Sequence, residues 1–150
     1  MKYGTISSGV EAHSLASVGL GDTAVFFSDI APGPCKLLPE RFPGVPNLGD
    51  MTRVDYDSDK EVVHNAVYNG YTPPDPKILG FNPVEAEYKE IPCKFGEVEL
   101  VCGGTPCTDA SVAGKRKGAA EGSGTRSALA FQLPRIGQSL GSRWILFENV

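Results

Sequence analysis

Short apolar segments alternate with amphipathic ones over the first fifty residues. Lys2 to Ser7 and Ala24 to Phe27 have the length and composition of buried strands. Between them, Val10 to Val18 predicts a helix, with Gly19 as its stop signal. The apolar positions of this helix, at roughly helical spacing, are Ala12, Leu15, Ala16 and Val18.

A second helix is predicted to begin at Pro34, to be interrupted at Pro39 and to end at Pro43. The first fifty residues therefore read as strand, helix, strand, helix. This order favours an α/β fold in which helices cover a parallel sheet.

The middle of the chain has a different character. From Asp55 to about Gly96 it is rich in acidic residues, tyrosine and proline. Lys60 to Tyr68 is predicted as a helix, and the rest as a long loop or inserted excursion. Loops of this length are uncommon in compact domains and are often functional.

Regular patterns return in the last third of the chain. Val98 to Cys102 is a candidate buried strand, and a glycine-rich run follows it. Ser127 to Leu140 is moderately helical although it contains Pro134, and Arg143 to Phe147 is a last apolar strand. We therefore expect one α/β domain over residues 1–150, with an insertion at about 55–96.

Composition narrows the class of protein. The chain has 150 residues, 14 Lys and Arg, and 18 Asp and Glu, which gives a net charge of −4. No global positive field indicates a nucleic-acid partner, so a polyanion site would have to be a local patch. No apolar run approaches the roughly 20 residues of a membrane helix, and no signal segment opens the chain. We expect a soluble, cytoplasmic protein that does not contact a membrane.

The cysteine and histidine content argues against a structural metal site. No C-x-x-C pair is present, so a zinc site is not expected, while a disulfide stays open. The few candidates are Cys35, Cys93, Cys102, Cys107, His13 and His64.

Three separate features suit a nucleotide. Ser8-Gly9 after the first strand lets backbone N–H groups approach a ligand at a helix N-terminus. Asp29 follows the second strand about twenty residues later, where nucleotide-binding folds place a carboxylate on ribose hydroxyls. Asp50 is expected at the end of a third strand. Each feature also has a plain structural interpretation, a turn or a solvated carboxylate, but their order favours an adenosine-type ligand.

A strand, a glycine pair and a rigid Pro106 precede Cys107, which places this thiol at the carboxyl edge of the sheet. A thiolate there is a candidate nucleophile if positive charge lowers its pKa. The only dense basic run, Lys115 to Lys117, lies between two glycines and suits a loop that touches phosphates. A buried apolar cysteine and a solvated loop are the alternatives.

The order of these pieces resembles a DNA cytosine-5 methyltransferase of the kind found in phages and prophages. The motifs that carry the resemblance are Ser8-Gly9-Val10-Glu11-Ala12, Asp29, Gly49-Asp50-Met51-Thr52, Gly104-Thr105-Pro106-Cys107, Ser111-Val112-Ala113-Gly114 and Phe147-Glu148-Asn149-Val150. The resemblance implies a Rossmann-like class I fold, S-adenosylmethionine as cofactor and double-stranded DNA as partner.

The resemblance also implies roles for individual residues. The Cys107 thiolate would add to carbon 6 of a flipped-out cytosine, and Glu148 would hold ring nitrogen 3, with a pKa raised by burial. Pro106 and Asn149 would position these groups, and Arg126 would lie near the active site. The cofactor residues would be Ser8, Gly9, Val10, Glu11, Asp29, Ile30, Asp50, Met51 and Leu129. The DNA contacts would be Ser111, Lys115, Arg116 and Lys117.

Several positions depart from the family pattern. Ser7 stands where the family usually has Phe, and Asp109 puts negative charge near the expected thiolate. The sequence stops at the Glu-Asn-Val motif, before the target-recognition region of typical members. A fragment, one half of a split enzyme with a second polypeptide, and an inactive cofactor- or DNA-binding module are the three interpretations, with the fragment first.

Overall fold

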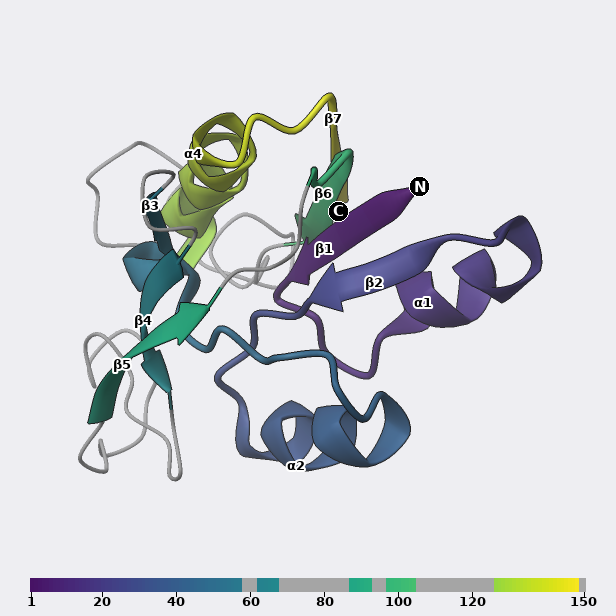
Figure 1. Ribbon diagram of the computed structural model, residues 1–150, viewed down its shortest axis with the longest axis horizontal. Helices are drawn as coiled ribbons and strands as arrows, with labels where there is room; N and C mark the ends of the chain where they lie inside the picture. The colour runs from purple at the N-terminus through teal and green to yellow at the C-terminus, as the bar shows by residue number, and fades with distance from the viewer. Residues whose placement is uncertain (58–61, 68–86, 93–96, 105–125, 149–150) are drawn as a thin grey trace.

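The computed structural model describes residues 1–57, 62–67, 87–92, 97–104 and 126–148. Its main sheet has four strands in the order β2-β1-β6-β7, and every neighbouring pair is parallel (Figure 1). The strands are β1 (Lys2–Ile6), β2 (Thr23–Phe26), β6 (Leu100–Gly104) and β7 (Trp144–Glu148). The predicted mixed α/β fold with a parallel sheet is therefore confirmed.

A second, antiparallel sheet joins β3 (Asp55–Asp57), β4 (Val62–Val67) and β5 (Glu87–Pro92) in that order. The helix predicted over Lys60 to Tyr68 is wrong, because β4 occupies most of that range. Three of its six residues are β-branched valines, which favour a strand, and β4 has a hydrogen-bonded neighbour on both sides. The expected long loop thus contains three strands.

The described chain also contains short helical segments. They are α1 (Ala12–Ser17), η1 (Val18–Leu20), α2 (Pro32–Arg41), η2 (Met51–Arg53), η3 (Arg126–Phe131) and α4 (Gln132–Ser139). None of the described helices is long and apolar enough to cross a membrane.

Pro134 lies near the start of α4, whereas Pro39 lies inside α2, which is not interrupted there as predicted. Helix α2 starts two residues before the predicted Pro34, runs through Pro39 and ends at Arg41, just before Pro43. Pro134 is the third residue of α4, where the backbone N–H has no partner within the helix in any case. Its ring therefore removes no helical hydrogen bond, and α4 does not need to kink at this proline.

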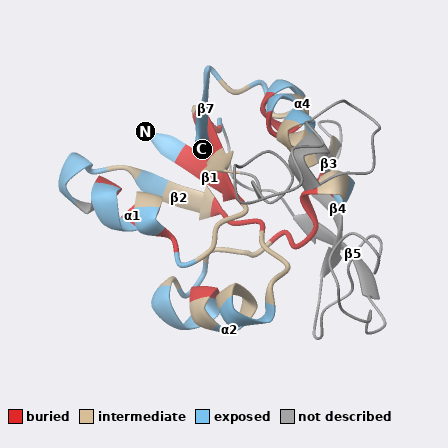
Figure 2. Cartoon of the chain, turned by 180° about the vertical axis from the view of Figure 1, so that it is seen from behind, coloured by how far each residue is buried: buried red, intermediate tan, exposed pale blue. Residues whose placement is uncertain are grey.

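Alternation along the strands divides the core between the two faces of the main sheet. The larger cluster contains Phe26 of β2, Val101 of β6 and two residues of α4, Leu133 and Ile136. The smaller cluster, on the other face, consists of Tyr3, Leu100 and Cys102 with Ala24 beside it. Figure 2 shows this buried centre in β1, with the outer sides of α1 and α2 exposed.

Helix α1 turns two serines, and not its leucine, toward the core. Leu15 is 58% exposed, whereas Ser14 and Ser17 are buried. The Ser14 hydroxyl has polar partners beneath the helix, on Tyr3 and Glu11. A polar environment under α1 therefore selects the serine face, and the apolar face is left toward solvent.

Two strand predictions also need correction. The predicted Val98 to Cys102 strand is observed as β6, which is shifted two residues toward the C-terminus. Asp50 does not end a third strand. The described chain has only an isolated parallel bridge there, between Phe27 and Asn47. Asp50 instead caps η2 with its side chain.

Candidate functional site

The loop that follows β1 has an unusual backbone. Ser7, Gly9 and Glu11 all adopt left-handed conformations, with φ angles of 50°, 56° and 62°. Glycine accepts this region freely, but serine and glutamate do so at a cost that neighbouring contacts must offset. The predicted glycine turn is therefore present.

The end of β2 holds this loop in place. Ser8 and Ser28 exchange two hydrogen bonds, one from the Ser8 N–H to the Ser28 carbonyl (3.3 Å) and one from the Ser28 N–H to the Ser8 hydroxyl (3.1 Å). The Gly9 N–H donates to Asp29 Oδ2 at 2.7 Å. The structure thus brings together Ser8, Gly9 and Asp29, which are twenty residues apart in sequence.

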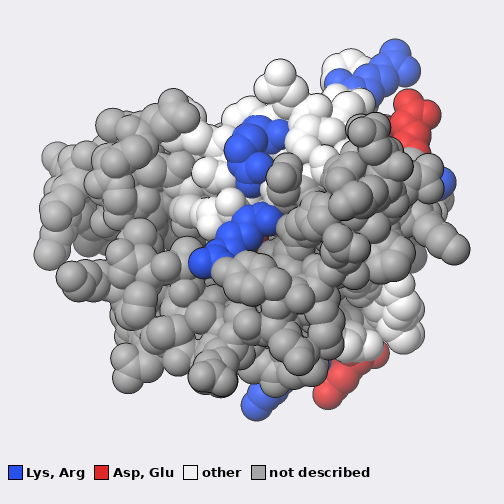
Figure 3. All heavy atoms as spheres, turned by 60° about the vertical axis from the view of Figure 1, so that its left-hand side comes forward, with Lys and Arg blue, Asp and Glu red and all other residues white. Residues whose placement is uncertain are grey.

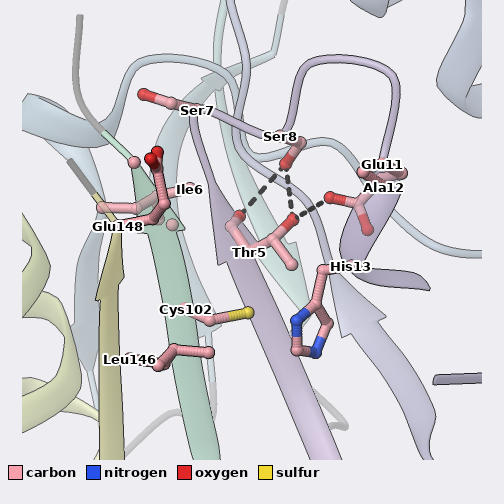
Figure 4. A pocket seen from close by; sticks show the side chains of 12 residues that line it. Thr5, Ile6, Ser7, Ser8, Glu11, Ala12, His13, Cys102, Leu146 and Glu148 are labelled. Atoms are coloured by element: carbon pink, nitrogen blue, oxygen red, sulfur yellow. Dashed lines mark hydrogen bonds between the residues drawn. The ribbon is translucent and has the colours of Figure 1, made fainter. Parts of the chain in front are cut away.

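Glu11 is the centre of a buried polar network. Its side chain is only 1% exposed. Thr5 Oγ1 donates to Oε1 at 2.5 Å, and the Ser14 hydroxyl donates to Oε2. Figure 4 shows Glu11, Thr5 and Ser8 linked by hydrogen bonds at the top of α1. Since a buried carboxylate is costly unless it is hydrogen-bonded, these hydroxyls are what stabilises it.

The direction of each hydrogen bond in this network follows from proton counting. Thr5 gives its single hydroxyl proton to Glu11, so Ser8 is the donor in their 2.6 Å contact, and its hydroxyl also donates to the Thr5 carbonyl oxygen at 3.3 Å. Ser14 likewise gives its proton to Glu11, so Tyr3 must donate to Ser14, also at 2.6 Å. Two chains of donors therefore converge on one carboxylate, and we call this set the Glu11 network.

A cavity of about 340 Å³ lies beside this network, between β1, α1, β6 and the end of β7. Its lining includes Ser7, Ser8, Glu11, His13, Cys102 and Glu148. Two glycines of β6 leave room for atoms of the neighbouring strands, Ile6 of β1 and Glu148 of β7. A Cβ on Gly103 would lie 2.2 Å from the Ile6 carbonyl oxygen, and one on Gly104 would lie 2.8 Å from Glu148 Oε2.

Cys102, which the sequence analysis did not assign to the site, forms part of this lining. Figure 4 shows its sulfur on the side of β6 that faces His13. Burial, and secondarily the charge of Glu11, raises the pKa of the Cys102 thiol from 9.0 to about 12. The group is therefore a neutral thiol at physiological pH and is not a nucleophile.

Glu148 lines the cavity from the end of β7, yet it is not buried as predicted. All five residues of β7 are exposed, and Trp144 reaches 56%. β7 is the outer strand of the main sheet, so described neighbours cover it on one side only. The expected burial of Glu148 at the end of an apolar strand is therefore wrong, although its place beside the β1 loop is established.

Asp29 is half-buried and is held at both carboxylate oxygens. Oδ2 accepts from Gly9, and Oδ1 accepts from the Ala31 N–H at 2.8 Å. Ile30, which lies between Asp29 and Ala31 in the sequence, is also half-buried. Val10, in the loop after β1, is 58% exposed. The carboxylate thus joins the two loops that follow β1 and β2.

Asp50 presents a buried acceptor without a hydrogen-bond donor. Its side chain is 2% exposed, and Oδ1 accepts from both the N–H and the hydroxyl of Thr52. Among the described residues, Oδ2 has no hydrogen bond, although Arg53 Nε lies 3.8 Å away. Met51 is part of the large core cluster. A donor such as an amino group is what this oxygen lacks.

Leu129 of η3 is partly buried against the large core cluster. Arg126 is the first residue of η3, and its side chain is outside the description. The remaining predicted site residues lie outside the described residues and stay predictions: Pro106, Cys107, Ser111, Lys115, Arg116, Lys117 and Asn149.

Two further polar side chains connect segments around the site and were missed from the sequence. The Arg135 guanidinium donates to the carbonyls of Met51 and Val54, both at 2.9 Å, and so ties α4 to η2. The Asn47 amide bridges the backbone at Asp29 and Gly49. Neither residue belongs to a chemical motif, and their partners are distant in sequence or set by a turn.

The described charges do not form one basic surface. On the face drawn in Figure 3, Lys and Arg side chains occur in separate groups among uncharged residues, and Asp and Glu lie near the edges. The basic run at Lys115 to Lys117 is outside the description.

The fold and site define a mixed α/β protein with a parallel sheet, consistent with a methyltransferase fold. Residues 77–150 match the family model described as C-5 cytosine-specific DNA methylase. In addition, 52 residues are 46% identical to a protein of Escherichia phage P1 named DNA N-6-adenine-methyltransferase. That match covers 35% of this chain and 7% of the phage protein. The resemblance to phage DNA methyltransferases that the motifs indicated is thereby confirmed.

Proposed function

We propose that this chain is the cofactor-binding and nucleophile-bearing part of a DNA cytosine-5 methyltransferase that uses S-adenosylmethionine. The observation that carries the proposal is the meeting of the β1 loop and Glu148 at one cavity. These elements are about 140 residues apart and belong to different family motifs. The match of residues 77–150 to the cytosine-specific family supports the same reading.

The residues present suit an adenosine ligand with a cationic centre. Asp50 Oδ2 is a buried acceptor that lacks a donor, which an adenine amino group would supply. Asp29, whose carboxylate joins two loops, is the residue that we propose accepts from ribose hydroxyls. The carboxylates of Glu11 and Glu148 line the cavity, and their negative charge favours a positively charged ligand. Bound S-adenosylmethionine supplies an electrophilic methyl group.

The chemistry at the base follows from the need to activate carbon 5 of cytosine. The Cys107 thiolate forms a bond to carbon 6, which moves an electron pair toward carbon 5 and lets it take the methyl group. Glu148 stabilises ring nitrogen 3. Because Glu148 is exposed, a flipped-out cytosine can reach it. A base from solvent would then remove the carbon-5 proton, its electron pair would re-form the double bond between carbons 5 and 6, and the carbon–sulfur bond would break to release the Cys107 thiolate.

The proposed fold is Rossmann-like class I, and the proposed partner is double-stranded DNA. The target cytosine must leave the duplex before a thiolate can reach carbon 6. Ser111 and the basic run from Lys115 to Lys117 are the proposed contacts to the phosphates. Arg126, Pro106 and Asn149 keep the positioning roles that the family resemblance implies.

Covalent trapping tests the mechanism. A duplex with 5-fluorocytosine has no carbon-5 proton to lose, so the bond between Cys107 and carbon 6 persists. We expect a protein–DNA adduct on a denaturing gel that requires S-adenosylmethionine and is absent in Cys107→Ser. The matched control Cys35→Ser, which changes a cysteine of α2, keeps the adduct. An adduct of equal yield in Cys107→Ser would overturn the mechanism.

A second candidate is methylation of the adenine amino group, because the phage P1 relative carries that activity in its name. An exocyclic amine can accept a methyl group without a cysteine adduct. Methyl transfer to a duplex of G·C pairs only supports the cytosine reaction, whereas transfer to a duplex of A·T pairs only supports the adenine reaction. The cytosine family match makes the first result the expected one.

A further inference from the structure

We propose that Asn47 is a positioning residue of the nucleoside site, where it fixes Asp29 relative to the segment that carries Asp50. The inference rests on the proposed function, since it names a residue that sets cofactor affinity. Nothing in the motifs assigns Asn47 a role. The case comes from the hydrogen bonds of its amide.

The Asn47 side chain contacts both main-chain groups of Asp29. Its Oδ1 accepts from the Asp29 N–H at 2.9 Å, and its Nδ2 donates to the Asp29 carbonyl at 3.0 Å. Oδ1 also accepts from the Gly49 N–H at 3.0 Å. One side chain therefore links the loop after β2 to the residue directly before Asp50.

The amide can have only one orientation. Its oxygen faces two N–H donors, while its nitrogen faces a carbonyl oxygen and the Cys35 sulfur, the latter at 3.5 Å. A flipped amide would oppose donor to donor and acceptor to acceptor. Each polar atom of Asn47 is thus used, which leaves the side chain no alternative set of partners.

The backbone hydrogen bonds between the segment after β2 and the segment before Asp50 end at Phe27, and side-chain hydrogen bonds of Asn47 follow them. Phe27 donates to the Pro46 carbonyl (2.9 Å) and accepts from the Leu48 N–H (2.7 Å), which aligns the two segments as a short parallel pair. Asp29 and Asp50 both lie beyond this pair. The Asn47 amide continues the ladder past its end, assisted by the buried Ser28 hydroxyl, which donates to the Gly49 carbonyl at 2.7 Å.

The hydrogen bonds of Asn47 determine how the Asp29 carboxylate lies relative to the Asp50 carboxylate. The side chain of Asp29 is fixed by Gly9 and Ala31, and its main chain by Asn47. Loss of the Asn47 contacts frees the main chain of Asp29 to rotate, which moves its carboxylate away from the position set for a ribose. Asn47 therefore acts through Asp29 and touches no reacting atom.

Titration calorimetry with S-adenosylhomocysteine, the stable product of the cofactor, tests this role on the full 150-residue chain. Asn47→Ala is expected to weaken binding about tenfold, the factor that corresponds to roughly 1.4 kcal/mol. Asn47→Asp keeps the acceptor but sets a carboxylate oxygen against the Asp29 carbonyl, so it weakens binding at least as much. The control Glu40→Gln, at an exposed position of α2, changes affinity less than twofold.

A double-mutant cycle separates positioning from a general loss of structure. If Asn47 acts through Asp29, Asn47→Ala has little further effect on affinity in an Asp29→Asn background, where the side-chain amide keeps one acceptor and binding is weaker but measurable. In steady-state methyl transfer, Asn47→Ala raises KM for the cofactor and leaves kcat and KM for DNA unchanged. Additive losses in the cycle, or a fall in kcat alone, would overturn the role of Asn47.

The same titration distinguishes a failure of the role proposed for Asn47 from a failure of the proposed function. Wild-type protein that binds the nucleoside ligand while Asn47→Ala binds equally well would overturn the inference and leave the proposed function standing. Wild-type protein that does not bind it at all would overturn the proposed function and the inference together. Faster hydrogen exchange at the Asp29 and Gly49 amides in Asn47→Ala, without ligand, is the expected structural signature.

Discussion

The two faces of the main sheet are built on opposite principles. On the α4 face, Phe26, Val101, Leu133 and Ile136 form a continuous apolar cluster with almost no exposure. On the α1 face, a short apolar patch adjoins the Glu11 network and the cavity. One face is a conventional core, whereas the other uses buried polar groups to shape a loop.

The difference shows where stability and function reside in this molecule. Burial of apolar side chains on the α4 face stabilises the fold through the hydrophobic effect. On the α1 face, the Glu11 network and the Asp29 carboxylate instead hold a loop whose backbone is left-handed at Ser7, Gly9 and Glu11. Local strain and buried polar groups of this kind concentrate at functional sites.

The largest effect is expected from a cavity in the apolar face. Phe26 is fully buried, and a Cβ on Gly4 would lie 2.0 Å from Phe26 Cε1, so the ring fills its space tightly. Phe26→Ala should lower the free energy of unfolding by about 3–5 kcal/mol, as measured by urea denaturation. Leu15→Ala on exposed α1 should change it by less than about 0.5 kcal/mol. Equal losses would contradict the division between the faces.

A smaller effect is expected from the polar face. Glu11→Gln keeps the shape of the side chain but replaces one acceptor with an NH₂ group that faces donated protons from Thr5 or Ser14. The free energy of unfolding should fall by about 1–3 kcal/mol, the cost of an unsatisfied buried polar group. The control Glu40→Gln, on the exposed side of α2, should have almost no effect. An unchanged stability in Glu11→Gln would show that the network does not stabilise the fold.

The smallest effect concerns pH. Because the fold raises the pKa of the Cys102 thiol from 9.0 to about 12, the unfolded chain loses this proton first as pH rises. The corresponding stability is complete below about pH 9 and is lost between pH 9 and 12. Cys102→Ala should therefore flatten the fall of unfolding free energy with pH above 9. A slope that is the same in both proteins would contradict the burial of a neutral thiol.

The sequence predicted those features that depend on short-range pattern. The four parallel strands, the turn at Gly9 and the carboxylate after β2 all follow from local apolar runs and turn residues. The motifs also predicted that Glu148 and the β1 loop belong to one site, and both line the cavity.

The features that were wrong depend on partners far along the chain. Helical spacing alone does not say which face of α1 is buried, and here Tyr3 and Glu11 give the Ser14 face its hydrogen-bond partners. β4 lies in a range that was expected as a helix, because its pairing with β5, which joins residues 20 to 30 positions apart, is not visible in the local sequence. Asn47 gave no signal at all, since its role exists only once β2 and the following segments are side by side.

Binding of S-adenosylmethionine to the 150-residue chain, measured by titration calorimetry, tests the central claim most directly. The account predicts micromolar or tighter binding that is lost in Asp29→Ala, while Glu40→Gln binds as the wild type does. A folded wild-type chain with no heat of binding, or an Asp29→Ala variant of unchanged affinity, would contradict the assignment of this loop junction as the cofactor site.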